Sequence, residues 1–200
     1  MFAALTLEES KALLALCSAG RLYEIEDWIR AGRSIEVSEG ARKKPLQVAI
    51  DTGFQSLIEL LVRNETHVKN KSKALADAIE GRRLNLVELL VEHGAEILSV
   101  PFADALRTWD AKIIRFFLDN GADVVRGAPF AVAFGEKVRT ALRPFVEYRK
   151  AHPEMASALQ EQADRALRHF CYEGDLKGLA CSFGRVPIRD RGGLRLTTGG

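Results

Sequence analysis

The sequence has few of the residues that support metal, redox or covalent chemistry. It contains three cysteines, Cys17, Cys171 and Cys181, an odd and widely separated set. Such a set argues against both a disulfide framework and a zinc cluster, and it favours a reducing compartment. The four histidines, at positions 67, 93, 152 and 169, are also too far apart to suggest a ligand set. The sequence therefore predicts neither a metal nor a cofactor.

The sequence also lacks an excess of charge of one sign, and it lacks long apolar runs. The 29 basic and 27 acidic residues leave a formal charge of +2, so no overall field attracts nucleic acid or an anionic membrane. The apolar runs fall short of the roughly 20 residues that a spanning helix needs. Residues 1–7 lack the basic region of a signal peptide, and Glu8 and Glu9 follow directly. We expect a cytoplasmic protein without membrane association.

Catalytic motifs are absent too. There is no Gly-x-Ser-x-Gly elbow, and the glycine pairs near the C-terminus lack the Lys-Ser/Thr of a phosphate-binding loop. Cys17 lies among leucines, which predicts a small buried side chain, and we expect the same of Cys171 and Cys181. Carboxylates such as Glu59 and Glu88 lie opposite a leucine stripe, as on a solvated helix face. We predict that the protein is not an enzyme, and an active domain in a longer chain is the least favoured alternative.

What the sequence does contain is a repeated pattern. The segment at 57–62 (Leu-Ile-Glu-Leu-Leu-Val) recurs at 86–91 and, more loosely, at 113–118. A second motif at 45–50 (Pro-Leu-Gln-Val-Ala-Ile) recurs with the same two shifts, so both motifs share one register. Weaker copies extend the pattern to units that start near residues 12, 45, 74, 101, 129 and 166. Copies that recur every 27 to 37 residues indicate a repeat architecture.

Each unit is predicted to form two short helices. Leu57, Leu60 and Leu61 have the i, i+3, i+4 spacing of an amphipathic helix. Prolines suit the first turn of the first helix, and glycines follow the second helix. These are Pro45, Pro101 and Pro129, and Gly32, Gly94 and Gly121. Small residues on the first helices allow close packing, at Ala49, Ala78, Ala105 and Ala133.

A unit of this kind cannot bury its apolar face alone, so neighbouring units must stack. The sequence therefore predicts an all-α fold, a helix-turn-helix repeat solenoid of about five to six degenerate repeats. It is expected to be one domain over 1–190, with a frayed tail over 191–200. Where the pattern is stretched, we expect one helix over 139–150 and a longer helix that starts at Pro153 and runs to His169.

Two of the motifs support a resemblance to a known family. Residues 92–97 (Glu-His-Gly-Ala-Glu-Ile) and 119–124 (Asp-Asn-Gly-Ala-Asp-Val) resemble the Gly-Ala-Asp-Val ending of an ankyrin repeat. Pro45-Leu46 and its copies resemble the Thr-Pro-Leu-His opening with its outer residues lost. The match covers roughly residues 8–190 and is similar in particular to bacterial ankyrin-repeat proteins. Since no unit keeps the Thr or the His, the loops between units are expected to be short or irregular.

The resemblance implies that a partner binds a concave face through the inter-repeat loops and the exposed positions of the first helices. Basic residues gather on the first two loops, and the site residues expected there are Arg33, Arg42, Lys43, Lys44, Lys71 and Lys73. Exposed positions on the first helices add Asp51, Thr52, Arg82, Thr108, Trp109, Glu136 and Lys137.

We predict another protein as the partner, held, inhibited or recruited by a monomer or weak oligomer. The alternative is nucleic acid or a phosphate ligand on the basic loops. It is less favoured, because no aromatic residues interleave the lysines. Lysines that only keep the loops solvated are a third interpretation. Two interpretations of Trp109 stay open, an interface anchor and a plug between repeats. Trp28 lies at a leucine position and is expected in the core.

Overall fold

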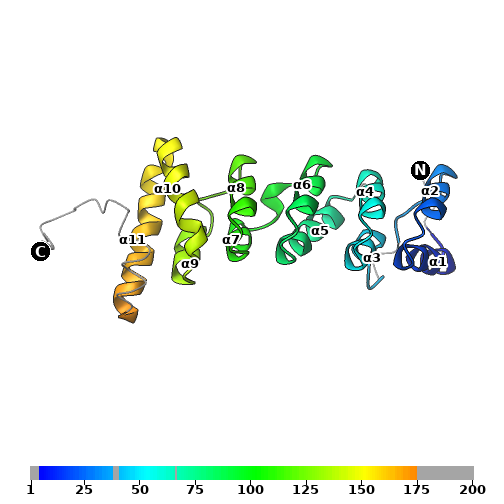
Figure 1. The fold of residues 1–200 in the computed structure, drawn as a ribbon, viewed down its shortest axis with the longest axis horizontal. Coiled ribbons are helices and arrows are strands. Elements are labelled where there is room, and N and C mark those ends of the chain that lie inside the picture. The colour runs from blue at the N-terminus through cyan, green and yellow to red at the C-terminus, as the bar shows by residue number, and fades with distance from the viewer. Residues whose placement is uncertain (1–4, 38–40, 66, 175–200) are drawn as a thin grey trace, which may run out of the picture. The chain divides into compact units, whose positions relative to one another are not determined.

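The computed structural model describes residues 5–37, 41–65 and 67–174. Within these ranges every regular element is a helix (Figure 1), which confirms the all-α class. The helices form two compact units, Met1–Val100 and Pro101–Gly200. Each unit is a stack of helical hairpins, as the repeated pattern predicts, and each is described by itself.

Unit 1 contains three hairpins. They are α1 (Leu7–Ser18) with α2 (Leu22–Arg30), α3 (Pro45–Thr52) with α4 (Gln55–Asn64), and α5 (Val68–Glu80) with α6 (Leu84–Glu92), followed by the short 3-10 helix η1 (Ile97–Ser99). The first helices α1, α3 and α5 pack in one row, and the second helices α2, α4 and α6 pack in another. Each hairpin thus buries its apolar face against a neighbour.

Unit 2 continues with two hairpins and one further helix. They are α7 (Phe102–Arg107) with α8 (Ala111–Asp119), then α9 (Pro129–Gly135) with η2 (Arg139–Ala141) and α10 (Leu142–Ala151), then η3 (Pro153–Met155) and α11 (Ala156–Glu173). Helices α7, α9 and α11 form the first row, and α8 packs against α10. The two helices predicted for the stretched region are confirmed, although each begins with a 3-10 turn.

The predicted register appears in the backbone conformation. In every described hairpin the turn from first to second helix holds one residue with positive φ, and α11 ends on another. These residues are Gly20, Gly53, Arg82, Trp109, Lys137 and Gly174. They are 33, 29, 27, 28 and 37 residues apart, the same steps that separate the predicted unit starts. Gly174 thus ends the first helix of the sixth unit. The rest of that unit, with Cys181 and the predicted tail, lies outside the described residues.

The core follows the predicted apolar positions. The four small residues of the first helices are almost completely buried: Ala49, Ala78, Ala105 and Ala133. The predicted helix-ending glycines, Gly32, Gly94 and Gly121, all have positive φ. In unit 2, aromatic rings fill the space between helices. Phe130 packs edge-on against Phe102 and Phe145, with ring centroids 5.5 and 5.0 Å apart. Such pairs stabilise a core beyond the area that they bury.

Two predicted environments are wrong because the side chain bonds to nearby backbone. Thr108 was expected to be exposed, but it is only 5 % exposed. Its hydroxyl donates to the Ala105 carbonyl at 2.7 Å and accepts from the Asp110 N–H at 3.1 Å. Trp28 was expected in the core but is half-buried, because its indole N–H donates to the carbonyl of Ser34 in the following loop.

Two further predictions concern a cysteine and a proline. Cys171 was expected to be buried but is exposed, whereas Cys17 is buried as expected. Pro101 was expected in the first turn of its helix, as Pro45 and Pro129 are. It is instead the N-cap residue of α7, with ψ of 132°, so this prediction is off by one position.

Candidate interaction surface

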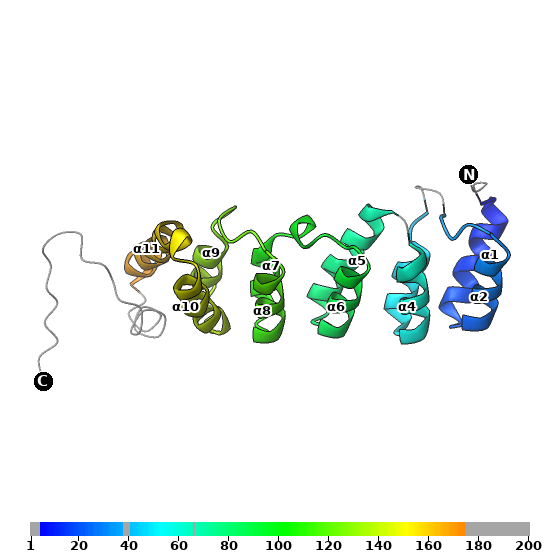
Figure 2. The same cartoon turned by 90° about the horizontal axis from the view of Figure 1, so that it is seen from above.

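Each unit presents two ends to solvent. Figure 2 shows that loops joining successive hairpins lie at one end of the helices and turns within hairpins lie at the other. We call them the loop edge of unit 1 (residues 31–37, 41–44, 65, 67–73 and 93–100) and the turn edge of unit 2 (residues 107–110 and 135–139).

The predicted site residues divide between these two kinds of edge. Of the six basic residues expected on loops, Arg33, Arg42, Lys43 and Lys44 lie on loops of the loop edge of unit 1. Lys71 and Lys73 were also expected on a loop, but this is wrong, because α5 already begins at Val68 and both lie in its first turns on the same edge. The others lie at helix ends or turns. Asp51 and Thr52 end α3 and Arg82 follows α5 in unit 1, whereas Thr108, Trp109, Glu136 and Lys137 lie in turns of unit 2. In unit 1 the predicted residues therefore lie at both ends of the hairpins, and Lys43 contacts Asp51 along α3.

Three of the loop cations are held by contacts within unit 1. The Arg33 guanidinium lies 4.8 Å from the centre of the Trp28 ring. The Lys71 ammonium donates to the His93 carbonyl at 2.6 Å, and that of Lys44 donates to the Val37 carbonyl at 3.2 Å. These side chains stabilise loop and helix ends, so only part of the predicted basic surface is available to a partner.

Other cations of the loop edge project into solvent. Arg42, Lys69 and Lys73 are exposed and make no hydrogen bond or ion pair with any residue that the structure describes. Lys69 lies one turn before Lys73 on α5, so the two side chains share one side of the helix. They are the basic groups of this edge that can bind a partner without giving up an internal contact.

An ion pair runs along the exposed side of α3. The Lys43 ammonium contacts Asp51 Oδ2 at 2.6 Å, and the Gln47 amide donates to Asp51 Oδ1 at 3.3 Å. The hydrogen bond from Lys43 is the main reason that the pKa of Asp51 lies below its ordinary value. Thr52, next to it, donates to the carbonyls of Val48 and Ala49, both at 3.0 Å. Lys43 and Asp51 thus partly neutralise each other.

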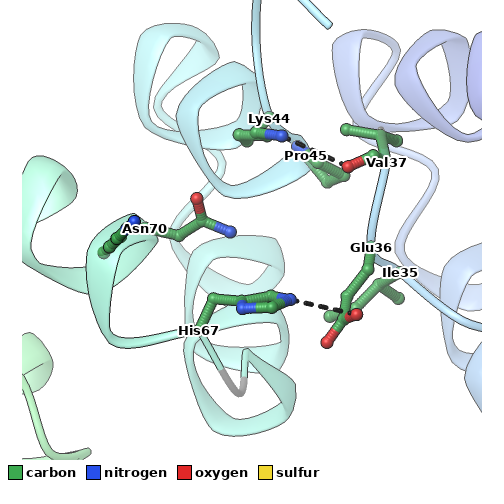
Figure 3. Close-up of a pocket in the computed structure, with 8 residues that line it drawn as sticks. Ile35, Glu36, Val37, Lys44, Pro45, His67 and Asn70 are labelled. Carbon is green, nitrogen blue, oxygen red and sulfur yellow. Dashed lines mark hydrogen bonds and ion pairs between the residues drawn. The ribbon is translucent and has the colours of Figure 1, made fainter. Parts of the chain in front are cut away.

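The loop edge also contains a cavity that the sequence did not predict (Figure 3). The cavity measures about 310 Å³ and is lined by Ile35, Glu36, Val37, Lys44, Pro45, His67, Lys69 and Asn70. Glu36 Oε2 lies 3.0 Å from His67 Nε2 in this cavity. The buried Glu65 fixes the side of the cavity that His67 and Asn70 form, because its two carboxylate oxygens accept from the His67 N–H and the Asn70 amide. Loops about 30 residues apart meet here, so only the repeat period brings these groups together.

On the turn edge of unit 2 the most exposed apolar group is Trp109. Its φ is 60°, the left-handed region that favours glycine. The residue is 44 % exposed, and its indole N–H has no acceptor among residues 5–37, 41–65 and 67–174. Thr108 and Asp110 fix the turn on either side, since Asp110 also caps α8 by accepting from the Lys112 N–H at 2.8 Å.

A second ion pair ties α7 to the turn after α9. The Arg107 guanidinium contacts Glu136 with Nε–Oε2 and Nη2–Oε1 distances of 3.0 and 2.8 Å, and its Nη1 contacts Asp104 Oδ1 at 3.0 Å. The hydrogen bond from Arg107 lowers the pKa of Glu136. The carboxylate of Glu136, a predicted site residue, is thus paired with Arg107. A role for Arg107 was not predicted from the sequence. The two are 29 residues apart, close to one repeat, which is the signal that would have paired them.

The described residues bear on two kinds of chemistry, metal binding and thiol reactivity. Across the described part of the chain, no group of three or more His, Cys, Asp or Glu side chains could hold a metal ion. Burial raises the pKa of the Cys17 thiol to about 12, so this thiol stays neutral and is a poor nucleophile. No described helix combines the length and the apolar character that crossing a membrane requires.

The chain is similar to known proteins in structure but not in overall sequence. No protein-family model and no curated protein matches the sequence. Among solved structures, the chain is similar to the ankyrin repeat domain of Bcl-3, described as a unique member of the IkappaB protein family. The two chains are 18% identical, the match covers 68% of this chain and 85% of that one, and the TM-score is 0.43.

Proposed function

We propose that this protein is an ankyrin-type protein-interaction module, which holds a partner protein through exposed residues at its turns and loops. The observation that carries the proposal is the side chain of Trp109, a large apolar group that the free protein leaves partly in water. Catalysis has no part in this function.

The backbone at Trp109 makes its identity informative. A side chain in the left-handed region costs of order 1–3 kcal/mol, and such residues cluster at functional sites. The equivalent turns of unit 1 at residues 20 and 53 use glycine, which avoids that cost. Arg82 and Lys137 also have positive φ at equivalent turns, so strain is shared by three turns and the large apolar ring is what distinguishes Trp109.

The environment of Trp109 favours an anchor over a plug. A plug between repeats would be buried with its N–H paired, as buried tryptophans usually are. Trp109 instead is 44 % exposed, and its N–H has no acceptor among the described residues. Tryptophan is among the residues that most often dominate binding energy at protein interfaces. A partner that covers the ring and supplies a carbonyl or carboxylate acceptor would satisfy both needs.

The free cations on the loop edge of unit 1 suit the same function. Arg42, Lys69 and Lys73 give a nearly neutral protein a local positive field, which speeds the encounter with an acidic surface. The proposed role is that of an adaptor or inhibitor that acts by occupying its partner.

The test is affinity capture from native lysate with the intact protein, Trp109→Gly and the control Tyr23→Ala. Tyr23 is 78 % exposed on α2 and lies outside the predicted surface. The proposal expects a stoichiometric protein with wild type and Tyr23→Ala, and recovery about tenfold lower or worse with Trp109→Gly, as for loss of a hot-spot residue. Equal recovery by all three proteins would remove Trp109 from the interface.

A further inference from the structure

The cavity on the loop edge of unit 1 has one apolar side and one cationic side. Ile35, Val37 and Pro45 supply the apolar groups, whereas Lys44 and Lys69 supply ammonium groups. Among the described residues that line it, Glu36 is the one carboxylate. The cavity therefore matches a ligand that places an acidic group beside an apolar one.

The contact of Glu36 with His67 shows how the cavity can bind a carboxylate. Its Oε2 contacts His67 Nε2 at 3.0 Å across the cavity (Figure 3). Both side chains remain about half exposed, at 44 and 58 %, and an ion pair this exposed contributes only about 0–1 kcal/mol. Because this contact is exposed, a carboxylate from another molecule can compete with Glu36 for the His67 imidazole.

The surroundings of the cavity favour a negative ligand further. Helices α3 and α5 both begin at it, at Lys44 and His67, and neither has a side chain capping its first turn. The partial positive charge of a helix N-terminus favours anions. At α5 the carboxylate of Glu65 already occupies this end by accepting from the His67 N–H and the Asn70 amide. The positive groups open to a ligand are therefore the start of α3 and the ammonium group of Lys69.

We propose that this cavity binds an acidic side chain in an extended segment of the partner protein, with a neighbouring apolar residue against Ile35 and Val37. The inference rests on the proposed function and names the chemistry of the partner segment. A peptide suits the cavity better than nucleic acid, because the described lining residues include no Phe, Tyr or Trp on which a base would stack.

The probe is a short fluorescent peptide in which Glu alternates with Ser and Val, compared with the same peptide carrying Gln in place of Glu. Binding to the full chain is measured by anisotropy. The first pair of variants is Lys69→Glu and Lys73→Glu. Both residues are exposed on α5, but only Lys69 lines the cavity. We expect Lys69→Glu to weaken binding of the Glu peptide about tenfold, and Lys73→Glu to weaken it less.

The second pair, Glu36→Gln and Glu96→Gln, removes one negative charge each from the same edge. Glu96 is exposed and does not line the cavity. Because Glu36→Gln frees His67, it should tighten binding of the Glu peptide about two- to fivefold, the range that a weak exposed pair allows. Glu96→Gln should change it less. Circular dichroism checks that all four variants remain folded.

Several outcomes would overturn the proposal. Equal effects within each pair would indicate general electrostatic attraction instead of a site in the cavity. Equal binding of the Glu and Gln peptides, or tighter binding of a single-stranded oligonucleotide with a steep salt dependence, would also contradict it.

If Trp109→Gly abolishes capture while the cavity variants leave the peptide unaffected, the proposed function stands and the cavity proposal fails. If capture survives Trp109→Gly while the peptide pairs behave as expected, the cavity proposal stands and the Trp109 interface fails.

Discussion

Non-glycine residues with positive φ in the turns carry backbone strain, and neighbouring residues can stabilise the fold without such strain. Arg82 has φ of 53° and an exposed side chain that makes no hydrogen bond or ion pair with described residues. Its neighbour Arg83 has an ordinary backbone and donates from Nη1 to the Ile50 carbonyl at 2.8 Å. Adjacent arginines therefore differ in what they add to the fold, because one carries strain and the other closes the end of α3.

Replacing these two arginines should have opposite effects on stability. Arg82→Gly removes the left-handed strain of about 1–2 kcal/mol, and the greater freedom of glycine in the unfolded chain offsets about 0.5–1 kcal/mol of it. We expect a net gain of up to about 1 kcal/mol. Arg83→Ala should lose about 1 kcal/mol with its hydrogen bond. Equilibrium urea unfolding measures both, and a destabilised Arg82→Gly variant would contradict the strain assigned to this turn.

The two described cysteines should differ in reactivity. Cys17 is fully buried with its pKa raised to about 12, whereas Cys171 is exposed. Alkylation of the native protein near pH 8, followed by peptide mass spectrometry, should label Cys171 and spare Cys17 until the chain unfolds. Since the folded state favours the neutral Cys17 thiol, its contribution to stability is complete below the ordinary pKa of 9.0 and is lost as pH rises toward 12. Rapid labelling of Cys17 in native protein would show that α1 packs differently.

At the scale of elements, a single glutamine joins α11 to the segment before α9. Gln162 is buried, and its amide N–H donates to the Val124 carbonyl at 2.7 Å while its Oε1 accepts from the Phe130 N–H at 3.0 Å. Both backbone groups would otherwise be buried without a partner. The side chain therefore fixes where the long helix α11 packs on the unit.

Gln162→Leu should cost about 2–4 kcal/mol, because it leaves two backbone groups unpaired at about 1–3 kcal/mol each. The matched control is Gln160→Leu on the same helix. Gln160 bonds only the part-buried Asp164, and its own Oε1 is buried without a partner. We expect the control to change the free energy of unfolding by less than about 1 kcal/mol. Similar losses for both variants, measured by denaturant unfolding, would contradict the role given to Gln162.

The helices themselves were predictable where local signals agree. The leucine spacing gave α4 and α6, and proline at the first helical position gave the starts of α3 and α9. Contacts between units of the repeat were not predictable in the same way. Arg107 with Glu136, and Glu36 with His67, join residues about one repeat apart, and their pairing depends on how side chains reach across neighbouring hairpins. Thr108 was misjudged because its hydroxyl bonds the turn's own backbone.

At the scale of the whole molecule, the repeat register is what the sequence conveys best. Its irregular steps reappear in the left-handed residues from Gly20 to Gly174, so period and backbone conformation agree along the chain. The register places a residue at each turn but does not say whether its side chain packs or projects. For Trp109 that distinction decides between a scaffold element and a binding group, and only the structure addresses it.

The most direct test of the account is the free energy of unfolding of Trp109→Gly, measured by equilibrium denaturation against wild type. If Trp109 is a strained, partly exposed anchor, its removal should change the free energy of unfolding by less than about 1 kcal/mol, because the strain that is relieved offsets the packing lost from the covered part of a residue that is 44 % exposed. A loss of about 3 kcal/mol or more, as expected when a packed tryptophan is truncated, would make Trp109 a plug between repeats and contradict the proposed interface.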